Sequence, residues 1–158
     1  MLIKKNKMIW LISGLLAWSL VGCAAEPRNN EPKKVPASVG VVNHTDRYIY
    51  FASVDGAGGG NMSEYGAGNA GMCCARIPEV WYPGMKVTVR WDMPVGIQHV
   101  DKEKVVEVER YEETGSIYIH IFQDDEVKVV VSPYASWSPR HPIPAPIKPI
   151  GWKRKAGA

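Results

Sequence analysis

Residues 116–132 read SIYIHIFQDDEVKVVVS, and this stretch decides the fold. Its alternating apolar side chains are Ile117, Ile119, Ile121, Val127, Val129 and Val131. A period of two places one face of a strand on a core and turns the other face away from it. The polar residues Gln123, Asp124 and Asp125 separate the two runs and predict a tight turn. The stretch therefore predicts two neighbouring strands of a β-sheet.

The same pattern extends outward from this stretch in both directions. Residues 86–91 and 106–109 alternate apolar with charged or hydroxyl side chains, and residues 37–42 and 48–54 are rich in β-branched and aromatic residues. The polar cluster of residues 43–46 predicts a hairpin turn between the last two runs. No window of a dozen residues shows a helical stripe. The chain is predicted to be all-β, with six or seven antiparallel strands in a small β-sandwich or open barrel.

A glycine-rich region, residues 55–76, interrupts the alternation and predicts a long surface loop. Residues 66–71, GAGNAG, formally match the dinucleotide fingerprint G-x-G-x-x-G. That fingerprint works only between a strand and a helix of a βαβ unit, and Pro78 follows here without any helical pattern. No Lys-Ser or Lys-Thr follows the glycines, which excludes a phosphate-binding P-loop as well.

The N-terminus predicts a bacterial lipoprotein. Lys4, Lys5 and Lys7 precede an uncharged apolar run, residues 8–21, which is too short for a spanning helix and has the length of a signal-peptide core. The sequence Leu-Val-Gly-Cys that ends at Cys23 resembles the lipobox, so residues 1–22 are predicted to be the signal peptide and Cys23 the lipidated residue. Ala24, where an aspartate would retain the protein at the inner membrane, favours the periplasmic side of the outer membrane. The alternatives are an ordinary secretory signal with a chance cysteine, or an uncut membrane anchor.

Composition divides the rest of the chain into three parts. Residues 23–36 are polar and proline-containing and predict a lipidated tether. Residues 37–135 form the predicted β domain, and residues 136–158 form a proline-rich tail that either packs on the domain or is free. The excess of three positive charges in the whole chain lies entirely in the signal peptide, so the remainder has a formal net charge of zero. Nothing in this balance favours nucleic-acid binding.

No residue pattern predicts catalysis, a metal or a cofactor. The four histidines, His44, His99, His120 and His141, have neither metal-site nor catalytic-triad spacing, and no G-x-S-x-G elbow is present. The adjacent acids of residues 124–126 are typical of a solvated turn. The adjacent cysteines Cys73 and Cys74 leave three alternatives: a vicinal disulfide, two buried thiols, or half of a metal site. A structural role is favoured, because zinc sites space their cysteines more widely and the periplasm permits oxidation.

The order of several motifs resembles one family. Residues 45–49 (TDRYI), Cys73-Cys74, Ile77-Pro78, Trp81 and Pro83-Gly84 follow one another as in lipoproteins of domain of unknown function 3304. The resemblance covers residues 38 to about 142, and the pair of cysteines followed by proline, tryptophan and Pro-Gly is its most specific element. Members are often encoded beside type VI secretion phospholipase effectors, and some are similar to the periplasmic immunity lipoproteins that neutralise those lipases.

The resemblance implies that this chain is an immunity protein rather than an enzyme, with a phospholipase effector as its protein partner. The predicted contact surface is the loop from Asp55 to Arg76 together with exposed aromatic residues near it. The predicted partner-binding residues are Asp55, Asn61, Tyr65, Arg76 and Tyr82. Two other hypotheses remain open: a structural or envelope-maintenance lipoprotein without a toxin partner, and a ligand-binding lipoprotein that uses the glycine-rich region.

Overall fold

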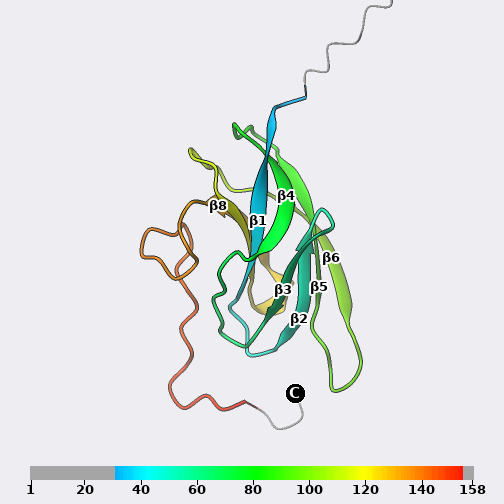
Figure 1. Cartoon of the computed structure of the whole chain (residues 1–158). Coiled ribbons are helices and arrows are strands. Elements are labelled where there is room, and N and C mark those ends of the chain that lie inside the picture. Colours follow the sequence, from blue (N-terminus) through cyan, green and yellow to red (C-terminus); the bar gives the residue numbers. More distant parts are fainter. Residues whose placement is uncertain (1–30, 155–158) are drawn as a thin grey trace, which may run out of the picture. The chain divides into compact units, whose positions relative to one another are not determined.

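The computed structural model describes residues 31–154 as a sandwich of two four-stranded β-sheets (Figure 1). The strands are β1 (Lys34–Asn43), β2 (Ile49–Val54), β3 (Ala57–Met62), β4 (Met72–Pro78), β5 (Lys86–Asp92), β6 (Asp101–Glu107), β7 (Ser116–Ile121) and β8 (Val127–Ser132). A short 3-10 turn, η1 (Gln123–Asp125), joins β7 to β8. The all-β sandwich predicted from the alternation is confirmed. The predicted signal peptide and Cys23 lie outside the described residues.

The strand order is β4-β1-β7-β8 in the first sheet and β3-β2-β5-β6 in the second. All neighbours are antiparallel except β1 and β7, which run parallel in the register Val39 to Ile117 through Asn43 to Ile121. The turn predicted between residues 42 and 48 is not a hairpin turn, because it carries the chain from β1 in one sheet to β2 in the other. Within residues 31–154 no helix is long and apolar enough to cross a membrane.

The glycine-rich region is more regular than predicted. It contains β3 and most of β4, so only residues 63–71 form an irregular loop and the strand count rises to eight. The alternation of apolar and polar side chains could not predict β3, because its sequence is AGGGNM. Its glycines serve close packing instead: a Cβ on Gly59 would lie 2.8 Å from Val41 Cγ2 and 2.9 Å from Val39 Cγ1. The absence of a side chain lets β3 approach β1 across the sandwich.

Replacing Gly59 with alanine is therefore expected to lower the free energy of unfolding by about 1–3 kcal/mol, because the added methyl overpacks the contact with β1. Gly71 is the matched control, since a Cβ there meets nothing within 4 Å and its φ is not positive. Gly71→Ala should be neutral or slightly stabilising. Chemical denaturation of the two variants measures both effects, and equal midpoints would contradict the packing role assigned to Gly59.

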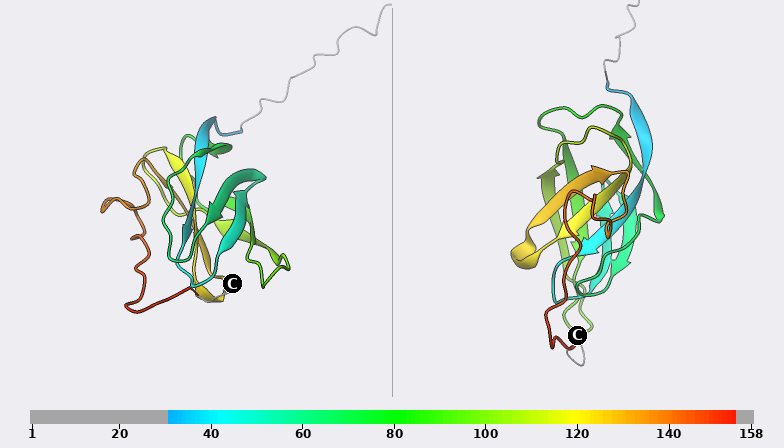
Figure 2. Two further views of the ribbon diagram at one scale, coloured as in Figure 1. Left: turned by 60° about the horizontal axis from the view of Figure 1, so that its bottom comes forward. Right: turned by 90° about the vertical axis from the view of Figure 1, so that its left-hand side faces the viewer.

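The core lies between the sheets and consists mainly of β-branched residues from the inward positions of the strands. Val39, Ile117, Ile119, Ile121 and Val129 are all fully buried there. The outward positions of β7 are also buried: Tyr118 is 2 % exposed and His120 is 0 % exposed. His141 and Ile143 of the C-terminal segment cover them together with Ala67 and Ala70, and Figure 2 shows this C-terminal segment running down across that sheet.

The boundaries of the domain are therefore wider than predicted. β1 begins at Lys34, inside the predicted tether, and its first residues pair only with β4. Pro36 is tolerated there because parallel pairing with β7 begins only at Val39. At the other end of the chain, residues of the predicted tail pack onto the sheet. Ile143 joins a second apolar cluster with Val42, Tyr118 and Val130.

Candidate partner-binding surface

The sandwich has two ends with different character. The Asn43 side chain donates to Ser63 O at 3.0 Å, which puts the end of β1 beside the end of β3. We call this the Arg47 end; the loops of residues 43–48, 62–65, 93–100 and 122–126 meet there. The opposite end, where β1 begins, is called the Lys34 end and carries the turn after β2 and the loop between β4 and β5.

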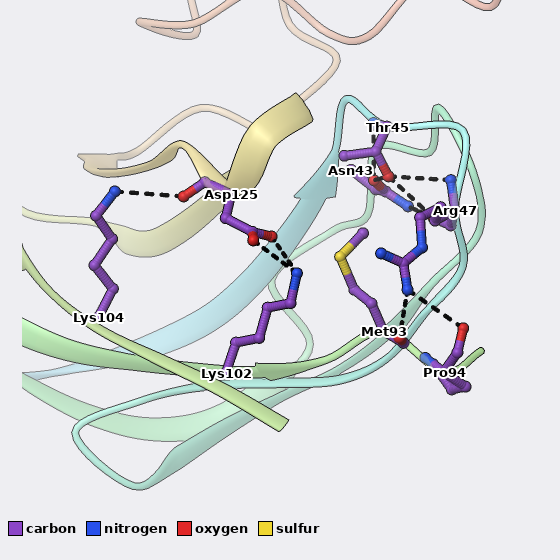
Figure 3. Close-up of polar contacts among 8 residues, drawn as sticks. All are labelled: Asn43, Thr45, Arg47, Met93, Pro94, Lys102, Lys104 and Asp125. Atoms are coloured by element: carbon purple, nitrogen blue, oxygen red, sulfur yellow. Dashed lines mark hydrogen bonds and ion pairs between the residues drawn. The ribbon is translucent and has the colours of Figure 1, made fainter. Parts of the chain in front are cut away.

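Asn43 holds the loop at the Arg47 end in a fixed shape. Its Nδ2 donates to Arg47 O at 2.6 Å, and its Oδ1 accepts from Thr45 N at 2.9 Å and from Thr45 Oγ1 at 2.8 Å (Figure 3). Both Asn43 and Thr45 are buried. An asparagine that bonds to the backbone two residues on replaces strand pairing with an Asx turn, which explains why the chain leaves its sheet here.

Arg47 is fixed by its backbone and by its side chain. Its guanidinium Nη2 donates to Met93 O at 2.7 Å, which ties the loop after β1 to the end of β5 (Figure 3). This arrangement satisfies a main-chain carbonyl and leaves Arg47 half-buried, at the rim of the hairpin that follows β5. A side chain held in this way loses little further rotamer entropy when a partner binds it.

The hairpin between β5 and β6 presents an apolar tip. Val95 and Gln98 exchange backbone hydrogen bonds of 2.9 and 3.1 Å, and Gly96 has a φ of 61°. Glycine at the first central position is what a type II′ turn requires. Ile97, at the second central position, is 98 % exposed. The turn therefore projects one large aliphatic side chain into solvent.

A buried carboxylate supports the base of this hairpin. Asp92 is 4 % exposed; its Oδ1 accepts from Val100 N at 2.9 Å and its Oδ2 contacts His99 Nδ1. The His99 ring meets the Tyr50 ring edge-on, with centroids 4.8 Å apart. Asp92 thus orients His99, and His99 in turn positions Tyr50, which remains 53 % exposed.

These groups border one shallow cleft of about 310 Å³, which we call the Arg47 cleft. It is lined by Arg47, Tyr48, Tyr50, Pro94, Gly96, Ile97 and His99. The combination of aromatic rings, an exposed aliphatic tip and one arginine is the composition enriched at the centres of protein–protein interfaces. Exposed apolar side chains that form a contiguous patch on a protein surface often mark an interaction site.

Beside the cleft, the edge strand β6 turns two lysines toward the other sheet. Lys102 Nζ lies 2.5 and 2.7 Å from the carboxylate oxygens of Asp125, and Lys104 Nζ donates to Asp125 O at 3.4 Å (Figure 3). Inward-facing charges on an edge strand oppose pairing with a further strand. This edge is therefore protected against pairing with a further strand.

The structure does not bring the five predicted partner-binding residues into one surface. Asp55 lies in the turn after β2, where its Oδ1 accepts from Thr88 N at 2.8 Å. Arg76 and Tyr82 are exposed toward the same Lys34 end. Asn61 and Tyr65 belong to the opposite end, and the Tyr65 ring packs edge-on against Trp152, with centroids 5.6 Å apart.

Of the three alternatives for the cysteines, the structure has the vicinal disulfide between Cys73 and Cys74, at the start of β4. Both residues are exposed, so the pair is not a set of buried thiols. In the part of the chain that the structure describes, no group of three or more His, Cys, Asp or Glu side chains is placed to hold a metal ion.

The histidines are less dispersed than their spacing suggested. His44, His120 and His141 form one hydrogen-bonded row on the outer face of the first sheet, whereas His99 alone borders the Arg47 cleft. The row could not be recognised from the sequence, because His44 and His120 are 76 residues apart and His120 and His141 are 21 residues apart. The sequence did not reveal the cleft, because its lining residues also come from separate segments of the chain. Pro94 and Gly96, which alternate with the apolar Val95 and Ile97, do indicate a turn with an exposed apolar tip.

Comparison with known proteins gives one match. A family model described as "protein of unknown function (DUF3304)" matches residues 42–129, which is more than half of the chain and includes the whole lining of the Arg47 cleft. Neither the curated proteins nor the solved structures contain a match to the chain.

Proposed function

The chain belongs to the DUF3304 family, and from that premise we propose that it is a periplasm-facing immunity lipoprotein that binds and inhibits a type VI secretion phospholipase effector. Its motifs resemble the DUF3304 lipoproteins, and the similarity of some of these to immunity lipoproteins suggests the partner. The single structural observation that supports binding is the Arg47 cleft, with its rigid loops and exposed apolar side chains.

An inhibitor of this kind needs a preorganised surface and no chemistry of its own. Affinity depends on a few well-packed anchors and on how little freedom is lost when they are buried. Tyr50 is held by its contact with His99, Arg47 by its bond to Met93 O, and Ile97 by a two-residue turn. These three side chains are the proposed anchors, set to enter the active-site mouth of the lipase or to hold its lid.

The position of the cleft suits a membrane-anchored inhibitor. The proposed lipid anchor is Cys23, and the tether from it enters the domain at Lys34, where β1 begins. The Arg47 cleft lies at the opposite end of β1, about 10 residues or 30 Å further along an extended strand. The cleft and the point where the chain enters β1 therefore lie at opposite ends of the domain.

The test uses the full chain purified in detergent and the phospholipase effector that the proposal expects to be encoded beside it. The proposal predicts a stable complex on gel filtration and loss of phospholipid hydrolysis as the lipoprotein approaches equimolar amounts. A bovine-type pancreatic phospholipase of unrelated sequence serves as the control for detergent effects and should remain active. Full hydrolysis by the adjacent effector at a large excess of lipoprotein would instead favour an envelope-maintenance role.

A further inference from the structure

The C-terminal segment, residues 133–154, forms a strap that is fastened to the sandwich at separate points. Ser136 Oγ donates to Gly68 O at 2.7 Å, and Arg154 Nη2 lies 2.7 Å from Oε2 of the buried Glu64. Between these two contacts, His141 is 5 % exposed and lies against the outer face of β7. The strap therefore ties the loop of residues 63–71 to the first sheet.

His141 attaches the strap through the row of three histidines. His120 Nε2 lies 3.1 Å from His141 Nε2, and His120 Nδ1 lies 3.0 Å from His44 Nε2. The far nitrogen of the row, His141 Nδ1, lies 3.1 Å from Tyr134 O. The row thus joins three separate segments: the loop after β1, the strand β7 and the strap.

Only one arrangement of protons satisfies this row when all three rings are neutral. A carbonyl oxygen can only accept, so His141 Nδ1 carries a hydrogen and its Nε2 accepts from His120. His120 Nδ1 must then accept from His44 Nε2. Each nitrogen–nitrogen contact holds one hydrogen, which leaves His44 Nδ1 as the one place for an added proton. A second added proton would put two hydrogens in one contact and break it.

The surroundings of the row offer a positive charge little compensation. Burial, together with the neighbouring His44 and His141, lowers the pKa of His120 to about 3. Burial lowers the pKa of His44 as well, and it lowers the pKa of His141 against the opposing effect of the hydrogen bond to Tyr134 O. Among residues 31–154 no carboxylate forms an ion pair with any of the three rings.

The elements around the row carry charged groups of both signs, with Asp46 in the loop of His44 and Glu126 beside β8 as acids. Lys128 is the register partner of His120 on β8; it lies over the Phe122 ring and pairs with Glu126 at 3.5 Å. On the strap, Arg140 stacks on Tyr134. The phenol of Tyr118, which meets the His141 ring, has a pKa raised by its own burial and remains neutral.

We infer that the histidine row is a pH-sensitive fastening that holds the strap on the sandwich when its rings are neutral and releases it on acidification. Release of the strap removes Ile143 from the apolar outer face formed by Val42, Tyr118 and Val130, which Ala67 and Ala70 still partly cover. The direction follows from linkage: rings with a lowered pKa in the fastened state favour release as pH falls below the ordinary value of about 6.5. At pH 5.0 each ring that gains a proton only on release shifts the equilibrium about 30-fold, and two such rings shift it about 1000-fold.

The test is the heteronuclear NOE of the backbone amides between Ser136 and Arg154, recorded on the full chain in detergent at pH 7.5 and 5.0. The expected result is a rigid strap at pH 7.5 and a mobile strap at pH 5.0, while the amides of β1 and β7 remain rigid. His120→Gln retains a donor and an acceptor without titrating, so its strap should stay rigid at pH 5.0. His99→Gln, outside the row, should show the same change in strap mobility between pH 7.5 and 5.0 as the unmodified chain.

A strap equally rigid at both pH values in the unmodified chain would overturn the inference. If the strap of His120→Gln is already mobile at pH 7.5, His141→Gln decides the matter, because it removes the titrating group from the strap itself. Release of the His141→Gln strap at pH 5.0 to the same extent as in the unmodified chain would also overturn it. Neither outcome depends on the phospholipase or on the Arg47 cleft.

Discussion

Replacing Ile97 with aspartate is expected to weaken binding of the proposed phospholipase partner by at least about 30-fold, which corresponds to about 2 kcal/mol. Ile97 is 98 % exposed at the tip of its turn, so the substitution removes a proposed anchor and introduces a charge that binding must desolvate. Because the side chain supports no part of the fold, the free energy of unfolding should stay within about 0.5 kcal/mol. Titration calorimetry measures the affinity.

Two matched controls locate the contact. Ile150→Asp makes the same chemical change at a fully exposed position of the strap that does not line the cleft, and it should leave the affinity unchanged. Tyr82→Ala removes an exposed aromatic at the Lys34 end and should also have no effect. If Tyr82→Ala weakened binding and Ile97→Asp did not, the contact would lie at the Lys34 end, as part of the prediction from sequence placed it.

The largest effect on stability is expected from Asn43→Leu. The substitution keeps the size of the side chain but removes its hydrogen bonds to Arg47 O, Ser63 O and the Thr45 backbone and hydroxyl. Asn43 is 0 % exposed, so water cannot replace these partners. With each orphaned group costing about 1–3 kcal/mol, we expect a loss of about 3 kcal/mol or more.

The control for this prediction is Asn61→Leu, an asparagine at an exposed position of β3. It should change the free energy of unfolding by no more than about 0.5 kcal/mol. Denaturant titrations followed by tryptophan fluorescence compare the two variants. Similar midpoints for Asn43→Leu and the unmodified chain would mean that the loop at the Arg47 end is held by other contacts.

The sandwich was predictable because apolar and polar side chains alternate along strands that bury one face. Ile117, Ile119 and Ile121 show this alternation and identify the inward face of β7. β3 was not predictable in this way, because its glycines carry no side chains to alternate and are needed for the close approach to Val39 and Val41. The turn after β1 was misassigned for another reason. Residues 43–46 have the composition of a hairpin turn, and only the bonds made by the buried Asn43 direct the chain into the second sheet.

The candidate site was harder to predict, because its residues are distant in the sequence. Arg47 and Ile97 are neighbours only because β2 pairs with β5, and no local pattern encodes that pairing. Four of the five residues predicted for binding are exposed and Tyr65 is half-buried, but strand direction sends them to opposite ends of the sandwich. The outward residues Tyr118 and His120 were predicted only to face away from the core, and the structure buries them under the strap together with Ala67 and Ala70.

The most direct test of the proposed immunity function is survival of cells that receive the adjacent phospholipase effector in their periplasm. The account predicts that cells expressing this lipoprotein survive and that cells without it die. Cells in which a cytoplasmic form without the signal peptide replaces it should die as well, because the proposed site of inhibition is the periplasm. Equal killing with and without the lipoprotein, once its presence in the envelope has been verified by immunoblotting, would contradict the account.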